Sequence, residues 1–313
     1  MKNRLLIILM LFASYGMNAQ HSPIVSHYLL NGVVINPAFA GSKEVFTANV
    51  MHRRQWASFK GAPISQLVSV HAPTKKDRVV LGLIVNNDRH GVANNTAFSA
   101  IIGYKLPLSD NASPGGKRSL TFALSGGAFL QTANFTDVIT NDQNDPAFSY
   151  DFRSRLTPDI GAGVYYQDKK WFAGISVPTM VERRFIPLDE DIKVAFQPEQ
   201  MNLVFQAGYL VKINDQLEWR PSFLAKTIPG LSSVIDFNNQ LVVNQIFLVG
   251  LSYRHQQTVV AMFEFKVNEQ LRLGYAFDYG FNALRSFNNG SHEISLQYAL
   301  GFKVKSANSR MPF

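Results

Sequence analysis

The sequence predicts an all-β fold: a transmembrane antiparallel β-barrel of about 14 strands that follows a cleaved signal peptide. In run after run, apolar side chains alternate with polar or small ones, and short turns separate the runs. Leu271, Leu273 and Tyr275 share one face, for example, while Arg272 and Gly274 share the other. Successive side chains of a strand point to opposite faces, so this alternation indicates strands. Because the apolar face is rich in aromatic residues, the pattern favours strands between lipid and an aqueous lumen.

The chain opens with a predicted signal peptide at residues 1–19. Lys2 and Arg4 precede an apolar run at residues 5–12, and Ala19 offers a small residue for cleavage. The apolar run is shorter than the roughly 20 residues that a transmembrane helix needs. Cleavage removes Lys2 and Arg4 and no acidic residue, so the formal net charge falls from +8 to +6.

Composition narrows the functional classes. Cysteine is absent, which excludes disulfide scaffolds, thiolate metal sites and thiol catalysis. The excess of positive charge is spread singly along the chain rather than clustered, so nucleic acid is not an expected partner. Anionic lipid headgroups, including lipopolysaccharide, or an acidic protein partner are better matched to such a charge.

Residues 20–42 alternate poorly and contain Pro23, Pro37 and Gly41, so we expect an irregular segment that is either periplasmic or lumenal. The barrel is expected over residues 43–303, with a periplasmic tail at 304–313. Its predicted strands are residues 45–54, 63–71, 79–87, 95–105, 119–131, 159–167, 170–177, 201–211, 217–226, 232–241, 247–253, 259–265, 271–279 and 292–302.

The connections support an even strand count. If both termini lie in the periplasm, the two longest polar stretches, 132–157 and 178–199, both fall on the outward side. Pro221 cannot donate to a ladder and predicts a bulge. Seven glycines are expected to face the lumen, and six aromatic residues near strand ends are expected at the membrane interfaces. These are Gly126, Gly161, Gly163, Gly174, Gly208, Gly250 and Gly274, and Tyr104, Tyr166, Trp171, Trp219, Tyr253 and Tyr279. A soluble β-protein remains the alternative.

Catalytic and metal-binding patterns are missing from the sequence. The seven histidines are scattered without an HExxH motif, and no glycine-rich loop has the phosphate-binding pattern. Asp142, Asp145 and Asp151 lack the spacing of a calcium loop. We therefore expect no enzyme activity, no cofactor and no metal.

Eight short motifs occur in order along the chain. They are residues 35–42 (INPAFAGS), 52–63 (HRRQWASFKGAP), 69–73 (SVHAP), 161–166 (GAGVYY), 172–178 (FAGISVP), 221–224 (PSFL), 250–254 (GLSYR) and 290–294 (GSHEI). With these motifs the chain resembles the PorP/SprF family, outer-membrane proteins linked to the type IX secretion system of Bacteroidota. The resemblance covers essentially the whole mature chain. One departure is His21-Ser22-Pro23, where the family usually has an Asp-Pro dipeptide.

The resemblance implies a non-enzymatic accessory barrel in the outer membrane. It would aid the export of a secreted partner, or anchor that partner at the cell surface through its C-terminal domain. Such a partner is often a large adhesin, and gliding motility is one process that these proteins serve. Other secretion-system or periplasmic components are further expected partners.

The outward loops are the expected docking surface for that partner. The candidate contact residues there are Phe148, Tyr150, Phe152, Arg153, Arg183, Arg184 and Phe185. The motif residues Asn36, Pro37, Gly41, Arg53, Gln55, Trp56, Gly61, Ala62 and Pro63 are expected to be structural. The rival hypothesis is a channel or substrate-specific porin, with Arg53, Lys105, Glu218, Arg220, Glu264 and Asp278 at the edge of its lumen.

Overall fold

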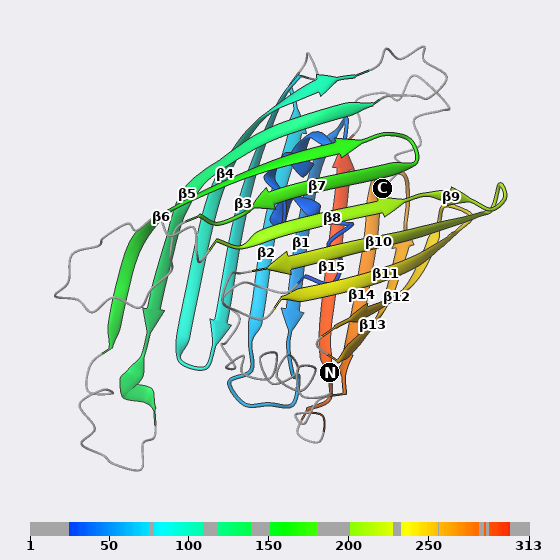
Figure 1. Cartoon of the computed structure of the whole chain (residues 1–313). Coiled ribbons are helices and arrows are strands. Elements are labelled where there is room, and N and C mark those ends of the chain that lie inside the picture. The colour runs from blue at the N-terminus through cyan, green and yellow to red at the C-terminus, as the bar shows by residue number, and fades with distance from the viewer. Residues whose placement is uncertain are drawn as a thin grey trace, which may run out of the picture.

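A computed structural model describes residues 25–74, 78–108, 118–138, 151–180, 201–227, 233–255, 257–281, 285 and 288–300. Its strands form one antiparallel sheet that curves round and closes on itself (Figure 1). Consecutive strands pair with each other, except that β8 and β9 both pair with β10, and β1 pairs with β15 to complete the circle. The chain is therefore a closed, all-β barrel, as predicted.

The strand bounds follow the apolar alternation closely. They are β1 (Phe46–Arg54), β2 (Ile64–Pro73), β3 (Val79–His90), β4 (Ala93–Pro107), β5 (Ser119–Ala133), β6 (Phe152–Gln167), β7 (Trp171–Val177), β8 (Leu203–Tyr209), β9 (Val211–Lys212), β10 (Leu217–Thr227), β11 (Val234–Val243), β12 (Phe247–Arg254), β13 (Thr258–Lys266), β14 (Leu271–Gly280) and β15 (Ser291–Leu300). The short 3-10 helices are η1 (Gly32–Val34), η2 (Pro37–Gly41) and η3 (Phe135–Asp137).

The segments β8 and β9 together form one strand of the wall, which gives the predicted total of fourteen. Both pair with β10, and the pairings on the two sides of their gap keep one register: Ser222 with Gly208, and Trp219 with Val211. The predicted bulge at Pro221 is therefore wrong, because no extra residue is inserted. The ladder is instead interrupted opposite Pro221, which has no N–H to donate.

The sixth strand is longer than the sequence indicates. It begins at Phe152 rather than at residue 159, and β5 continues to Ala133, so the predicted polar loop 132–157 is wrong at both ends. Residues 152–158 alternate weakly, but they pair with β5 as far as Ala133–Phe152. Cross-strand pairing has overridden local composition here.

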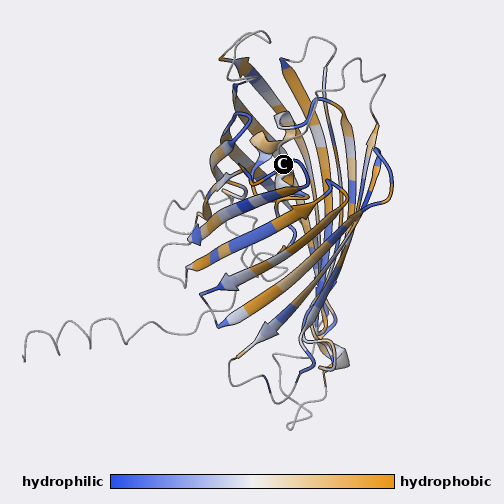
Figure 2. Cartoon of the chain, turned by 90° about the vertical axis from the view of Figure 1, so that its right-hand side faces the viewer, coloured by the Kyte–Doolittle hydropathy of each residue, from blue (hydrophilic) through white to orange (hydrophobic). Residues whose placement is uncertain are grey.

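The barrel is apolar outside and polar inside. Outward Leu83, Ile102 and Leu251 are among the most exposed large apolar side chains, whereas inward Gln206 and Gln240 are almost completely buried. Figure 2 shows the resulting alternation of hydrophobic and hydrophilic residues along the strands. A soluble protein has the reverse arrangement, so this barrel is built to face lipid.

One predicted inward residue points the other way. Gly126 shares the exposed face of β5 with Phe122 and Leu124, so its prediction as a lumenal glycine is wrong. The sequence misleads here because Gly126 and Gly127 are adjacent, and either could take the inward position.

At the membrane interfaces, Trp171 and Trp219 are exposed at strand ends, as a girdle of aromatic side chains requires.

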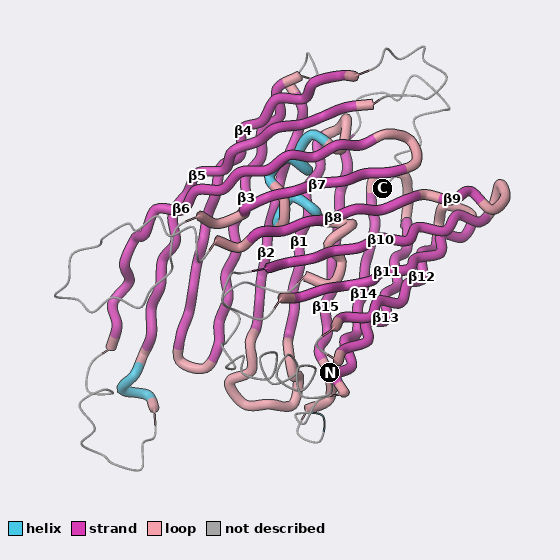
Figure 3. Tube along the Cα trace, viewed as in Figure 1, coloured by secondary structure: helices cyan, strands magenta, loops and turns pink. Residues whose placement is uncertain are grey.

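The barrel has two different rims. The short-turn rim carries the start of β1, the end of β15 and the connections 74–78, 108–118, 168–170, 213–216, 244–246 and 267–270, of which only 108–118 is long. The long-loop rim carries four longer connections, 55–63, 134–151, 178–202 and 281–290, and three short ones, 91–92, 228–233 and 255–257. None of the helices in the described part of the chain is long and apolar enough to cross a bilayer. The helical turns η1 and η2 lie within the ring of strands (Figure 3).

Candidate functional site

The lumen is occupied by residues 25–43 of the same chain, which we call the lumenal segment. Its side chains Tyr28, Val33 and Ala38 are at most 1% exposed, although most of the segment is irregular. The segment runs through the barrel from the long-loop rim to the short-turn rim. Ser26 contacts the residues near the start of β15, and the Ser42 carbonyl accepts a hydrogen bond from Gln167 at the end of β6 (2.9 Å).

The half of the segment nearer the short-turn rim is held by apolar packing. Phe39 packs edge-on against Tyr165 (ring centroids 5.4 Å apart), and Tyr165 stacks on Phe172 (5.7 Å). Val33 and Ala38 belong to the same buried cluster. Aromatic contacts of this geometry add to the free energy gained by burial. The lumen therefore has a core of its own, built from η2 and the wall.

Asn36 fixes the start of η2 against the wall. Its side-chain oxygen accepts a hydrogen bond from the Ala38 N–H (2.9 Å), and its amide nitrogen donates to the Val164 carbonyl (3.1 Å). Two glycines make this approach possible. A Cβ on Gly174 would lie 2.7 Å from the Asn36 amide nitrogen, and a Cβ on Gly163 would overlap its oxygen. The glycines of β6 and β7 thus accommodate one side chain of the segment.

The half nearer the long-loop rim is held by charged groups. The Glu293 carboxylate accepts hydrogen bonds from the Ser26 and His27 N–H groups, at 2.8 and 2.9 Å, and lies 3.2 Å from His27 Nδ1. Asp278 accepts a hydrogen bond from the Ser26 hydroxyl at 2.9 Å. Arg53 donates to Ser26 Oγ (3.0 Å) as well. Two consecutive residues of the segment are therefore bound through both backbone and side chain.

Ion pairs extend this cluster along the wall. Arg53 pairs with Asp278 (2.7 Å) and Glu293 (3.2 Å), while Arg254 pairs with Asp278 and Asp236, both at 3.0 Å. We call Arg53, Asp236, Arg254, Asp278 and Glu293 the lumenal charge cluster. All five side chains are buried, and they come from five strands. Buried charges persist only when they are paired in this way.

A second charged group lies toward the short-turn rim. Lys43 Nζ donates to Gln297 Oε1 at 2.9 Å, and Gln297 Nε2 donates to the Leu30 carbonyl at 2.7 Å. Burial lowers the pKa of Lys43 to about 7, and the positive charges of Arg272 and Arg220 act in the same direction. The neutral amine can still donate its hydrogen bond, so the wall holds this end of the segment in either state.

The motif residues predicted to be structural fall in two places. Asn36, Pro37, Gly41 and Arg53 lie in the lumen, where Gly41 packs against Thr121 and Arg53 belongs to the lumenal charge cluster. The other five lie in the rim loop, residues 55–63 between β1 and β2. They are Gln55, Trp56, Gly61, Ala62 and Pro63, and the Gln55 N–H donates to the Pro63 carbonyl at 2.9 Å.

The rim loop is tied to the β14–β15 connection. The Ala57 N–H donates to the Gly290 carbonyl (2.9 Å), and the Trp56 N–H donates to Ser291 Oγ (3.2 Å). Trp56 has a φ of +47° and Gly61 one of +76°, so the loop depends on two left-handed residues. Phe59 at its tip is 52% exposed. The loop therefore presents an aromatic side chain on an ordered backbone.

Most of the residues predicted to bind a partner fall outside the described part of the chain. These are Phe148, Tyr150, Arg183, Arg184 and Phe185. Phe152 and Arg153 open strand β6, where Phe152 pairs with Ala133, at the long-loop rim. Their place as partner contacts stays a prediction.

Sequence reasoning missed His27, Asp236, Arg254 and Glu293. An isolated histidine in an irregular segment carries no distinctive signal. The other three do carry one, since each is an ionisable residue on the inward face near the end of an observed strand. In the described residues no three His, Asp or Glu side chains are grouped as metal ligands. The arrangement suits the binding of a peptide segment rather than catalysis.

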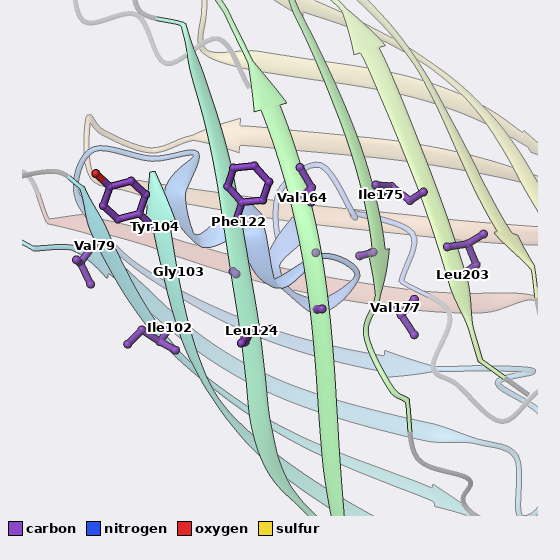
Figure 4. A pocket seen from close by; sticks show the side chains of 14 residues that line it. Val79, Ile102, Gly103, Tyr104, Phe122, Leu124, Val164, Ile175, Val177 and Leu203 are labelled. Carbon is purple, nitrogen blue, oxygen red and sulfur yellow. The ribbon is translucent and has the colours of Figure 1, made fainter. Parts of the chain in front are cut away.

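An apolar hollow of about 720 Å³ lies on the outer wall, across β3 to β8. Figure 4 shows Tyr104, Phe122 and Ile175 around it, with the helical turns of the lumenal segment behind the strands. Its lining continues the apolar belt of the barrel. It is therefore part of the lipid-facing surface rather than a site for a polar ligand.

Solved structures of outer-membrane proteins are among those to which the chain is similar. The chain is similar to the outer membrane protein Omp33 of Acinetobacter baumannii, with 6% identity and a TM-score of 0.43 over 83% of this chain and 100% of that one. A triple-mutant porin of Rhodopseudomonas blastica is similar at 8% identity and a TM-score of 0.35, over 82% and 99%. No curated protein sequence matches the chain.

A family model supplies the assignment. Residues 17–298 match the model of the type IX secretion system membrane protein PorP/SprF, which is most of the chain. A membrane protein that forms a closed β-barrel with an apolar belt lies in the outer membrane. The chain therefore belongs to the PorP/SprF family of type IX secretion system membrane proteins.

Proposed function

We propose that this protein is a non-enzymatic accessory barrel of the type IX secretion system. It aids the export of a secreted protein, or anchors that protein at the cell surface through its C-terminal domain. A large adhesin, such as those used in gliding motility, is the kind of partner that fits. Membership of the family supports the link to secretion. The filled lumen is the observation that favours an accessory role over a channel.

The lumen is poorly suited to conduction. A porin needs an open path lined by charged side chains that meet passing solutes. Here Arg53 and Asp278 are paired with each other and buried against the lumenal segment. Glu218 and Arg220, on β10, are likewise paired, at 3.0 Å. The inward charges are thus used to hold the chain's own residues in place.

A barrel with a filled lumen acts through its rims and its outer wall. We place the long-loop rim at the cell surface, with the start of β1 and the end of β15 on the periplasmic side. This rim carries Phe152 and Arg153, the outward connections and the ordered rim loop with Phe59. Lipopolysaccharide would surround the same rim. Other secretion-system or periplasmic components would meet the short-turn rim.

Purification of the tagged full chain from its native outer membrane tests this function. We expect mass spectrometry to identify a secreted surface protein, together with secretion-system components. The Phe59→Ala variant should retain less of the surface protein, since exposed aromatic residues are frequent anchors of interfaces. Phe46→Ala is the matched control, because Phe46 is also exposed but lies at the opposite rim.

The contrary result is equally clear. A barrel that purifies without any secreted protein and conducts ions in planar bilayers would support the channel instead. Equal retention of the partner by both variants would remove Phe59 from the docking surface.

A further inference from the structure

The lumenal charge cluster is unbalanced when it is counted without the lumenal segment. Asp236, Asp278 and Glu293 contribute three negative charges, and Arg53 and Arg254 contribute two positive ones. One negative charge is therefore left over. All five side chains are at most 4% exposed, so water cannot compensate for it. The wall needs one more positive charge at this place.

His27 is the group that lies where the missing charge is needed. Its ring is 1% exposed, and its Nδ1 is 3.2 Å from the Glu293 carboxylate. Its Nε2 atom faces Gly274 and has no hydrogen-bond partner among the described residues in either protonation state. The surrounding charges therefore decide which state is favoured, and an imidazolium brings the cluster to neutrality.

We propose that the inner wall carries a peptide-binding socket, formed chiefly by Arg53, Asp278 and Glu293, that takes a positively charged segment. The resident ligand is the start of the lumenal segment, with His27 held as an imidazolium. Glu293 recognises two successive backbone N–H groups, and Asp278 recognises the hydroxyl of Ser26. The chemistry of the ligand is thus a hydroxyl residue followed by a cation.

The socket lies across the seam that closes the barrel. Arg53 of β1 and Glu293 of β15 are directly opposite each other in the closing ladder. Both contact Ser26, and Asp278 of β14 joins them. A seated segment therefore bridges the first and last strands of the wall. Binding of the lumenal segment therefore stabilises the pairing of β1 with β15, and that pairing in turn assembles the binding site.

The charged groups around His27 come from every neighbouring strand. Glu293 of β15 is in contact, Asp278 of β14 is adjacent, and Glu264 of β13 adds a further negative charge. The positive charges are Arg53 and Arg254 on β1 and β12, and Asp236 lies on β11. Burial lowers the pKa of His27, but the hydrogen bond and charge of Glu293 more than offset it. The net effect raises that pKa above its ordinary value of 6.5.

Single-cysteine labelling tests the proposal, since the chain has no cysteine of its own. Val33→Cys places a thiol in the lumenal segment at a position that is 1% exposed. In the full-length barrel near pH 6, we expect this thiol to be protected from a bulky polar maleimide. Adding His27→Gln should speed labelling by at least about tenfold, because it leaves a buried charge unpaired. His52→Gln, on the exposed face of β1, is the control.

A second substitution separates charge from packing. The double variant His27→Gln/Glu293→Gln again has a neutral cluster, so protection of the Val33→Cys thiol should return to within about twofold of the parent. Heat-modifiable migration on a gel reports whether each barrel has folded. If His27→Gln does not fold, the proposal predicts that the double variant does.

The pH dependence of thiol labelling is a third test of the proposal. His27 stabilises seating fully below pH 6.5, and this contribution is lost as pH rises through its raised pKa. Labelling of Val33→Cys, relative to the exposed Lys60→Cys thiol, should therefore increase with pH, and the double variant should lose this increase. All of these proteins carry Lys43→Met, so that the titration of Lys43 near pH 7 does not contribute. Equal protection in His27→Gln and its parent, or a double variant worse than the single one, would overturn the proposal.

Discussion

At the scale of single residues, Lys43 is the unusual group outside the strands. It is buried, it donates to Gln297, and Arg272 and Arg220 are the cations nearest to it. Glu218 and Glu264 supply two negative charges against these two arginines. The surroundings are therefore balanced when Lys43 is neutral, in agreement with its pKa of about 7.

The lowered pKa of Lys43 predicts a pH dependence of stability. The unfolded chain binds a proton at this lysine up to about pH 10.5, whereas the folded chain releases it near pH 7. The free energy of unfolding should therefore rise with pH between these values. Lys43→Met should remove that rise and stabilise the barrel below pH 7 by about 1–4 kcal/mol. Urea midpoints of both proteins across pH 6–10 measure the difference, and parallel curves would contradict the charge assignment.

Gly163 gives a second prediction at this scale. Gly163→Ala places a methyl group against the Asn36 side chain, so we expect a loss of about 1–3 kcal/mol in the free energy of unfolding. Gly126→Ala is the matched control, because nothing lies within 4 Å of the Cβ that it adds. Urea unfolding in the same lipid vesicles compares the two. If Gly126→Ala lost as much stability as Gly163→Ala, the loss would not come from contact with the lumenal segment.

At the scale of elements, β15 and β1 decide whether the barrel closes. Leu296 faces outward and pairs with Val50 across the seam and with Leu273 on the other side. Leu296→Arg should therefore cost about 2–4 kcal/mol and reduce the heat-modifiable folded form. Gln216→Arg, in an exposed turn of the short-turn rim, should fold normally. Full assembly of the Leu296→Arg protein would contradict the observed register.

The β7–β8 connection is the element expected to contact the secreted partner. Residues 178–180 are best retained, because the Met180 N–H bonds to the Ile160 carbonyl at 2.8 Å. Deletion of residues 181–199 should release the surface partner while the barrel stays in the outer membrane. Fractionation and surface immunoblotting would show this. Unchanged display of the partner would exclude this connection as the docking element.

The strands were predictable because each carries its own signal. Alternation in residues 271–279 identifies both the strand and its outward face, and the same holds for β12 and β15. The start of β6 was not predictable, because residues 152–158 are strand only through pairing with β5. Gly126 shows a related limit: a glycine pair does not indicate which member faces inward.

At the scale of the whole molecule, the filled lumen explains why so many charged residues are buried. The lumenal charge cluster joins Ser26 to strands separated by more than 200 residues in sequence. Inward ionisable residues mark single members of the cluster, but no local pattern predicts how they come together, because the cluster exists only once the barrel has closed. The sequence does indicate that residues 20–42 are irregular, but irregularity alone does not distinguish a lumenal from a periplasmic position.

The central claim is that residues of this chain fill the lumen of its own barrel, and that the protein acts by binding partners rather than by conducting solutes. Conductance of the purified full-length protein in planar bilayers at pH 6 tests it most directly. The account predicts no stepwise openings of porin size, because residues 25–43 fill the lumen from one rim toward the other. Regular, long-lived conductance steps from the unmodified protein would contradict it.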